Sequence, residues 1–157
     1  MKTRLLDVNV LVSLLDSAHV HHQPAVAWFR DVAAAQGWAT CPITENGFVR
    51  VVSSVSYPNL RLTPAMAAQS LARFKAGFPG VHRFWPDAIS LADTAIFDLA
   101  CLTGSRQTTD IYLAGLAFHN GGCLTTLDGA VQWRAIRGAS AGLVETVACT
   151  TAAPGIP

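Results

Sequence analysis

The sequence predicts an α/β protein with a central, mostly parallel sheet of four to five strands and helices on both faces. Short apolar runs alternate along the chain with longer segments of helical spacing, an order that is typical of parallel sheets with crossover helices. The 157 residues fit one domain of roughly 150 residues. Hydrophobic residues make up 51% of the chain, enough for a core without disulfides. We expect one domain over residues 1–151 and a frayed tail at 152–157.

The N-terminal part of the chain predicts two strands and three helices. Apolar residues form short runs at the strands and recur at helical spacing in the helices. The strands are expected at 4–7 and 38–41, and the first two helices at 8–15 and 19–36. Gly37 is a helix terminator, and Pro42 is suited to the first turn of the third helix.

The middle of the chain predicts a loop, a helix and a third strand. A loop is expected at 57–63, where Thr63 can cap a helix that has Pro64 in its first position. Glycines at 77–80 end this helix, and a third strand follows at 81–85. Residues 86–98 read as a mixed connection with a short helix.

The C-terminal part predicts one amphipathic helix and two more strands. Thr109 or Asp110 is expected to cap the helix, which ends before Asn120. The strands are expected at 123–127 and 143–147, with a short helical turn at 129–133 between them.

Charge and cysteine content restrict the classes of function. A net charge of +1 excludes a protein that holds nucleic acid by bulk electrostatics. The four cysteines, Cys41, Cys101, Cys123 and Cys149, lack zinc-ligand spacing and read as small core residues in a reducing compartment. No apolar stretch approaches the roughly 20 residues of a membrane span, so we expect no membrane segment and a cytoplasmic location. The low charged fraction of 13% predicts an apolar surface suited to an oligomer or partner.

Four carboxylates stand at the ends of apolar runs, although Asp and Glu together number only 10. Asp7 and Asp128 close the first and fourth predicted strands. Asp110 opens the helix before the fourth strand, and Glu45 lies one turn inside the helix after the second. Ligands of parallel sheets bind at the carboxyl ends of the strands, so we expect these four candidate catalytic acids to converge there.

Three of the four acids also have an evident structural alternative. Asp110 could be a helix N-cap, and Asp128 could be a turn residue before Gly129. Glu45 could simply favour the dipole of its helix. Asp7, between Leu6 and Val8, has no evident structural role.

Converging carboxylates without thiol or imidazole partners favour a hard cation, Mg²⁺ or Mn²⁺. We expect Asp7 and Asp110 to bind it, and Glu45 and Asp128 to bind it directly or through water. Such an ion lowers the pKa of a bound water and offsets phosphate charge, so phosphodiester hydrolysis is the natural reaction.

Polar and basic neighbours complete the predicted site. Asn9, Thr109 and Thr126 are expected to support the ligands from a second layer. Arg50 and Arg106 are candidates for contacts with RNA phosphates.

Four segments, 5–12, 44–51, 109–117 and 125–128, together resemble the PIN-domain nucleases, and specifically the VapC ribonuclease toxins of bacterial toxin–antitoxin pairs. The resemblance runs in order through nearly the whole chain. It implies a PIN-like three-layer sandwich and places the family's acidic quartet on the four acids above. The family's frequent Asp-Thr-Asn opening has Val8 at its middle position here, so one hydroxyl beside the first acid is missing.

The resemblance also implies an activity and partners. These are Mg²⁺- or Mn²⁺-dependent cleavage of RNA of the transfer or ribosomal class, a homodimer, and inhibition by a cognate VapB-type antitoxin. Two other functions compete with this one. A phosphatase of the haloacid-dehalogenase type would need an acid where Asn9 stands. A non-catalytic partner-binding module would leave the acids without a metal.

Overall fold

A computed structural model of the chain describes residues 2–148 and contains one five-stranded sheet in which every neighbouring pair is parallel. The strand order is β3-β2-β1-β4-β5. The strands are β1 (Arg4–Leu6), β2 (Trp38–Thr40), β3 (His82–Phe84), β4 (Cys123–Thr126) and β5 (Val144–Thr146). The predicted α/β class is confirmed, and the tail predicted at 152–157 lies outside the described residues.

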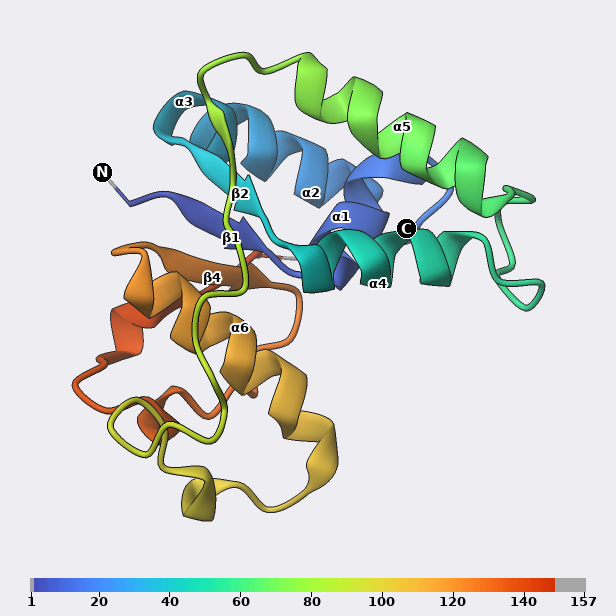
Figure 1. The fold of residues 1–157 in the computed structure, drawn as a ribbon. Helices are drawn as coiled ribbons and strands as arrows, with labels where there is room; N and C mark the ends of the chain where they lie inside the picture. Colours follow the sequence, from blue (N-terminus) through green and yellow to red (C-terminus); the bar gives the residue numbers. More distant parts are fainter. Residues whose placement is uncertain (1, 149–157) are drawn as a thin grey trace, which may run out of the picture.

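The helices flank this sheet in the order that the sequence predicts (Figure 1). The longer ones are α1 (Val8–Leu15), α2 (His22–Trp28), α4 (Pro42–Val52), α5 (Pro64–Ala76) and α6 (Thr108–His119). A π-helical segment η1 (Phe29–Ala33) and the short α3 (Ala34–Gln36) continue α2, and Gly37 ends this run with φ 106°. Four 3-10 turns follow later: η2 (Leu99–Cys101), η3 (Ser105–Gln107), η4 (Trp133–Ala135) and η5 (Ala141–Leu143).

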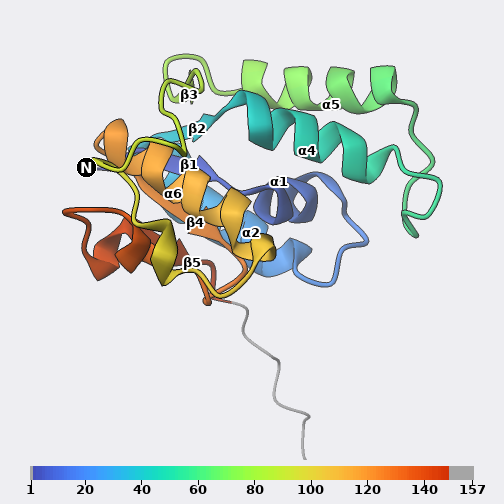
Figure 2. The ribbon, with the colours of Figure 1, turned by 60° about the horizontal axis from the view of Figure 1, so that its bottom comes forward.

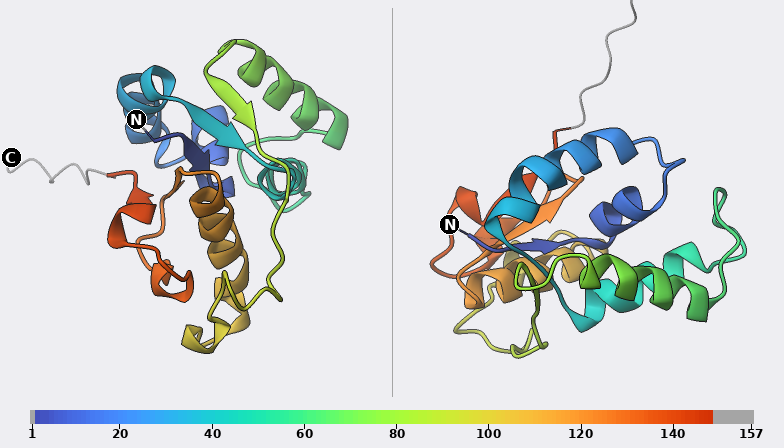
Figure 3. Two further views of the ribbon diagram at one scale, coloured as in Figure 1. Left: turned by 60° about the vertical axis from the view of Figure 1, so that its left-hand side comes forward. Right: turned by 90° about the horizontal axis from the view of Figure 1, so that it is seen from above.

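Two hydrophobic cores lie on opposite sides of the sheet. Leu5 belongs to the core that α6 covers, and Leu6 belongs to the core formed with α1, α2, α4 and α5. Both leucines are fully buried, as expected where successive strand residues point to opposite faces. Figure 3 shows α2 and α6 on opposite sides of the sheet. The apolar run at β1 is therefore continuous because both faces of the strand are covered.

Helix α6 differs from its prediction in two ways. Its N-cap is Gln107, so Thr109 and Asp110 lie inside the first turn and neither caps the helix. Seven consecutive residues from Ile111 to Ala117 are buried, so the helix is embedded in the protein rather than amphipathic. The alternative that Asp110 serves as a helix N-cap is excluded.

Three further predictions were wrong in detail. The second helix starts at His22 rather than at residue 19, because His19 and Val20 form a turn with bonds from His19 N to Asp16 O and from His22 N to His19 O. Residues 86–98 contain no helix, and the first short one is η2 at Leu99. Cys101 is exposed, whereas Cys41 and Cys123 are buried as expected and Cys149 lies outside the described residues.

Helix α4 packs closely on α1 because residue 47 has no side chain. A Cβ atom at Gly47 would lie 2.5 Å from Val8 Cγ2, nearer than real Cβ contacts allow. Since Val8 follows Asp7 directly, this contact brings α4 beside the end of β1. On its other side α4 lies along α5 (Figure 2).

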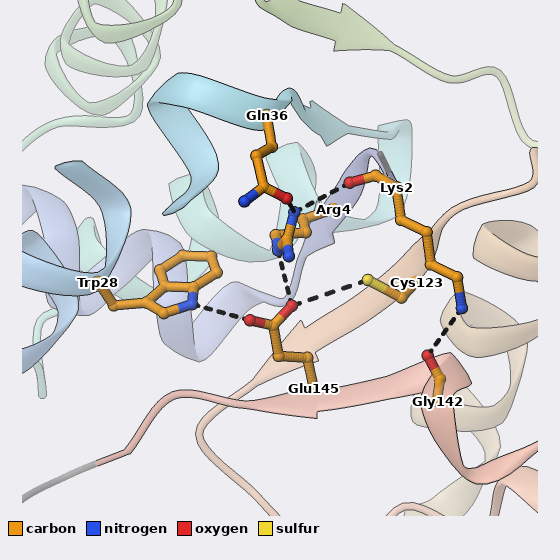
Figure 4. A network of polar contacts seen from close by, with 7 residues as sticks. All are labelled: Lys2, Arg4, Trp28, Gln36, Cys123, Gly142 and Glu145. Atoms are coloured by element: carbon orange, nitrogen blue, oxygen red, sulfur yellow. Dashed lines mark hydrogen bonds and ion pairs between the residues drawn. The ribbon is translucent and has the colours of Figure 1, made fainter. Parts of the chain in front are cut away.

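A polar network joins the edge strand β5 to the start of β1 and to α2 (Figure 4). Glu145 accepts hydrogen bonds from Arg4 Nε at 2.7 Å and from Trp28 Nε1 at 3.0 Å. Arg4 also donates to the Lys2 carbonyl and to Gln36. These contacts join β5 to β1 and α2, so they hold the sheet together without contributing to the carboxyl ends of the strands.

Asp16 ends α1 at its C-cap and is buried. Its Oδ2 accepts hydrogen bonds from the Tyr57 hydroxyl and from Asn59 Nδ2 at 2.7 Å. These bonds tie the loop between α4 and α5 to the end of α1. Within residues 2–148 no helix is both long and apolar enough to span a bilayer.

Candidate active site

Asp7 is the buried centre of the candidate site, directly after β1 and at the N-cap of α1. Its Oδ1 accepts a 2.7 Å hydrogen bond from Val8 N, and its Oδ2 accepts one of 2.7 Å from Thr126 Oγ1. Burial raises the pKa of the Asp7 carboxyl above its ordinary value, hydrogen bonds from Thr126 and Val8 oppose the rise, and the nearby Asp128 adds to it. Both oxygens are thus oriented by the protein before any ligand arrives.

Thr126 and Asn9 tie the end of β4 to the start of α1. Thr126 Oγ1 accepts hydrogen bonds from Asn9 Nδ2 and from the Asp128 backbone N–H, each at 3.1 Å. Asn9 Oδ1 accepts one from Leu127 N at 3.1 Å. One hydroxyl therefore connects Asp7, Asn9 and Asp128, so Asn9 and Thr126 both lie beside predicted acids.

Asp110 and Asp128 share the electrostatic environment of Asp7. Burial raises the pKa of Asp110 to about 6, and repulsion from Asp7 and Asp128 adds to the rise. Asp128 is exposed, and its Oδ1 accepts a 2.9 Å hydrogen bond from Ala130 N, the turn contact that the structural alternative expects. The structure thus brings together the carboxylates that follow β1 and β4 and the one in the first turn of α6.

Glu45 is hydrogen-bonded to α5 and to the last residue of β2. Its Oε1 accepts hydrogen bonds from Lys75 Nζ of α5 at 2.5 Å and from Thr40 Oγ1 at 2.6 Å. Thr40 Oγ1 in turn lies 2.8 Å from His82 Nε2, and Lys75 Nζ sits over the ring of Phe84. Glu45 also lines a cavity between α4 and α5. These contacts do not join it to the three aspartates.

A cavity of about 420 Å³, here called the α4 groove, opens beside the aspartates. Val8, which follows Asp7, and Thr109, which precedes Asp110, both line it. Arg50, a candidate for a phosphate contact, lines it as well, whereas Arg106 is exposed on η3 and is not among its lining residues. Thr109 is exposed in the first turn of α6, and no hydrogen bond links it to an acid within the described residues.

The donor set of the three aspartates fits a hard cation. As the side chains stand, no group of three or more His, Cys, Asp or Glu in residues 2–148 could hold a metal. Mg²⁺, however, is usually held by one or two carboxylates and several waters. Asp7 and Asp110 are the two whose pKa values are raised by burial and by neighbouring negative charge, and a cation between them would relieve that repulsion.

The sequence interpretation missed Lys75 and Asp87. Lys75 pairs with Glu45 across 30 positions of the chain, and no local pattern indicates such a contact. Asp87 lines the α4 groove from the connection after β3. Its position in the run from Trp85 to Asp87, directly after a predicted strand, is the one signal that could have drawn attention to it.

A parallel α/β sheet with aspartates at the carboxyl ends of its strands is consistent with the class of PIN-like proteins. No protein-family model matches the chain. Ribonuclease VapC44 of Mycobacterium tuberculosis is 42% identical over 136 residues, which cover 87% of this chain and 93% of the relative. Ribonuclease VapC39 of the same organism is 43% identical over 145 residues, or 92% of this chain and 99% of the relative. Ribonuclease VapC38 is 42% identical over 81% of this chain and 86% of its own length.

The chain therefore belongs to the VapC ribonuclease family. The resemblance inferred from the four sequence segments is confirmed at the level of the family.

Proposed function

We propose that this chain is a metal-dependent endoribonuclease, the toxin of a toxin–antitoxin pair, that hydrolyses phosphodiester bonds in RNA of the tRNA or rRNA class. Membership of the VapC family supports the ribonuclease activity. The observation that carries the chemistry is the cluster of Asp7, Asp110 and Asp128, in which burial and mutual repulsion raise the pKa values of Asp7 and Asp110. A cluster of this kind is better suited to a cation and a phosphate than to folding alone.

In the proposed site, Asp7 and Asp110 would hold Mg²⁺ or Mn²⁺, and Asp128 would act directly or through water. When bound, the cation supplies a water of lowered pKa and offsets negative charge on the phosphate. Thr126 keeps the Asp7 carboxylate in place by donating to Oδ2, while Val8 N–H holds Oδ1. Asp128 is the exposed member of the cluster. Its carboxylate would accept the proton that leaves the attacking water.

The role of Glu45 as a fourth catalytic acid stays a prediction of the sequence. Its hydrogen bonds to Lys75 and Thr40 are those of an ion pair that links α4 to α5. The proposed chemistry therefore rests on the three aspartates.

The proposed partners are a VapB-type antitoxin and a second copy of the chain. Apolar side chains reach the surface on several elements, including Val55 in the loop after α4, Met66 on α5 and Phe118 on α6, with exposed fractions of 96%, 48% and 41%. Such side chains favour protein contacts over water. A cellular RNA substrate places this proposed activity in the cytoplasm. Analytical ultracentrifugation of the purified chain alone and with its antitoxin would measure both associations.

The test of the proposed function is cleavage of total bacterial RNA by the purified protein with and without Mg²⁺. We expect cleavage that requires the metal and falls by about a hundredfold or more in Asp7→Asn, since the amide keeps the size of the side chain but is a poor ligand. Equal cleavage by both proteins would overturn the mechanism. Mapping new RNA 5′ ends after induction in a bacterial host would then identify the target.

The phosphatase and the binding module, the two competing functions, can be distinguished from the ribonuclease with the same protein. A phosphatase of the haloacid-dehalogenase type is disfavoured because Asn9 stands in place of its second acid and is hydrogen-bonded to Thr126 and Leu127. A non-catalytic binding module would bind neither Mg²⁺ nor Mn²⁺ in calorimetry.

A further inference from the structure

The α4 groove is bounded by the chain neighbours of three of the four predicted acids. Val8 adjoins Asp7, Thr109 adjoins Asp110, and Asn46 adjoins Glu45. Pro42, Asn46 and Arg50 recur every four residues, so one face of α4 forms a wall of the groove. A phosphate at the three aspartates would therefore have its neighbouring nucleotide at or in this groove.

The walls of the groove have two chemical parts. Val8, Pro42 and Ile43 provide an apolar surface on which the flat face of an aromatic ring can lie. Arg50 and Asp87 provide one cation and one carboxylate. The volume of about 420 Å³ falls within the roughly 300–1,000 Å³ that is common for small-ligand sites. An apolar floor with one anion-binding side chain and one acceptor suits a nucleotide of a single strand, whose unstacked base exposes its edge.

Asp87 decides which base edge fits. An ionised carboxylate only accepts hydrogen bonds. It is positioned at the groove by the loop after β3 and also interacts with the Tyr112 hydroxyl of α6. Guanine offers adjacent N1–H and N2–H donors on its Watson–Crick edge, whereas uracil presents two carbonyl oxygens on either side of one N–H. A carboxylate favours the first arrangement and repels the second.

We propose that the α4 groove binds the nucleobase next to the scissile phosphate, and that Asp87 selects a base with donor groups on its edge, guanine most strongly and uracil least. This inference rests on the proposed ribonuclease function, whose site it extends. Arg50 holds a phosphate of the same strand and does not discriminate between bases.

The first experiment measures cleavage of single-stranded RNA oligonucleotides in which the two nucleotides flanking the cleaved bond are varied among the four bases. We expect the wild-type protein to prefer guanine over uracil at one of these two positions, and Asp87→Asn to reduce that preference by about tenfold. Arg50→Gln should raise KM for every oligonucleotide with the preference intact. Asp31→Asn is the matched control, because Asp31 is an exposed acid on η1 that pairs with Arg30. Unchanged base preference in Asp87→Asn would overturn the proposal.

The second experiment measures binding without metal or cleavage. Guanosine 5′-monophosphate should shift the methyl NMR signals of Val8 and Ile43 in the wild-type protein at lower concentration than uridine 5′-monophosphate. Asp87→Asn should bring the two concentrations together, and Asp31→Asn should not. If neither nucleotide shifts these methyl signals, the groove is not a base site. If the wild-type protein binds guanosine 5′-monophosphate but cleaves no RNA, the ribonuclease proposal fails while the nucleotide site stands.

Discussion

Lys75 Nζ lies 2.5 Å from Glu45 Oε1 and joins α5 to α4 through an ion pair in which each side chain is 25% exposed. Thr40 donates a hydrogen bond to the same carboxylate oxygen. The pair lies in the cavity between α4 and α5, whereas Val8 and Thr109, the neighbours of Asp7 and Asp110, line the α4 groove. In this arrangement Glu45 connects two helices, and none of its hydrogen bonds within the described residues goes to Asp7, Asp110 or Asp128.

We predict from this geometry that Glu45→Gln lowers RNA cleavage by less than about tenfold, against a loss of about a hundredfold or more in Asp7→Asn. The reason is that glutamine removes charge from the link between α4 and α5 but leaves all three aspartates in place. Steady-state cleavage of one oligonucleotide at saturating Mg²⁺ measures the difference. A loss as large as that of Asp7→Asn, with unchanged stability, would restore Glu45 as the fourth catalytic acid.

Lys75→Met should lower the free energy of unfolding by about 1–2 kcal/mol, because it leaves a half-buried carboxylate without its cation. Urea unfolding followed by circular dichroism measures this loss. Arg30→Gln, which breaks the exposed Arg30–Asp31 pair, is the control and should change nothing measurable. Equal effects of the two variants would show that burial of the Glu45–Lys75 pair contributes nothing to the free energy of unfolding.

Thr126→Val should disturb the candidate site through Asp7. Valine keeps the shape of threonine but removes the hydroxyl that donates to Asp7 Oδ2 and accepts from Asn9 and the Asp128 backbone. Leaving these buried groups without a partner costs about 1–3 kcal/mol of stability. We expect kcat to fall together with the stability in Thr126→Val. Thr126→Ser should lose less of both, because serine keeps the hydroxyl.

Thr125, the neighbour of Thr126, gives a matched control. Thr125 Oγ1 is buried on the same strand and makes no hydrogen bond within the described part of the chain. Thr125→Val should therefore be neutral or stabilising, since it removes an unsatisfied polar atom. Losses of similar size in Thr125→Val and Thr126→Val would mean that the effect comes from packing in β4 and not from the Asp7 hydrogen bond.

The sequence predicted the parts of the site that strand ends determine. Asp7 and Asp128 follow buried strands, and the parallel topology brings such positions to one edge whatever the details of packing. Asp110 was predicted at the right end of its helix for a partly wrong reason, because it lies inside the first turn and does not cap it.

The contact between Glu45 and Lys75 could not be predicted from the sequence. Placing Glu45 one turn inside a helix does not say which side of that helix it occupies, and a shift of one residue turns a side chain by about 100°. Thr44, Phe48 and Val52 are buried at a spacing of four and define the inward face of α4, which leaves Glu45 beside α5. The partner on α5 depends on how two helices pack, and that is a tertiary contact that no local pattern encodes.

The pH dependence of stability should reveal the strain in the aspartate cluster of the metal-free protein. The pKa of Asp110 is about 6 in the folded state against 3.8 ordinarily, so the folded state binds more protons than the unfolded state between these values. The free energy of unfolding must therefore fall as the pH rises from about 4 to about 6, by up to about 3 kcal/mol. Asp110→Asn should reduce this fall in urea unfolding with EDTA present, and Asp7, whose pKa burial also raises, accounts for the part that remains. A slope in the variant as steep as that of the wild type would assign the effect to groups other than Asp110.

Adding metal should reverse that penalty. A ligand that binds only the folded state stabilises it by about 2.7 kcal/mol at a concentration of 100 times its dissociation constant. We therefore expect Mg²⁺ or Mn²⁺ to raise the melting temperature of the wild-type protein at pH 7.5 and EDTA to lower it again.

Asp110→Asn should start from a higher metal-free melting temperature, because it lacks one of the repelling charges, and should respond weakly to the metal. Asp31→Asn, whose acid lies on η1 and pairs with Arg30, should respond as the wild type does. Equal stabilisation of the wild type and Asp110→Asn would place the metal elsewhere, and no stabilisation of either would favour a binding module over a nuclease. The opposite shifts expected for one substitution, with and without metal, separate a cation site from a carboxylate that serves the fold alone.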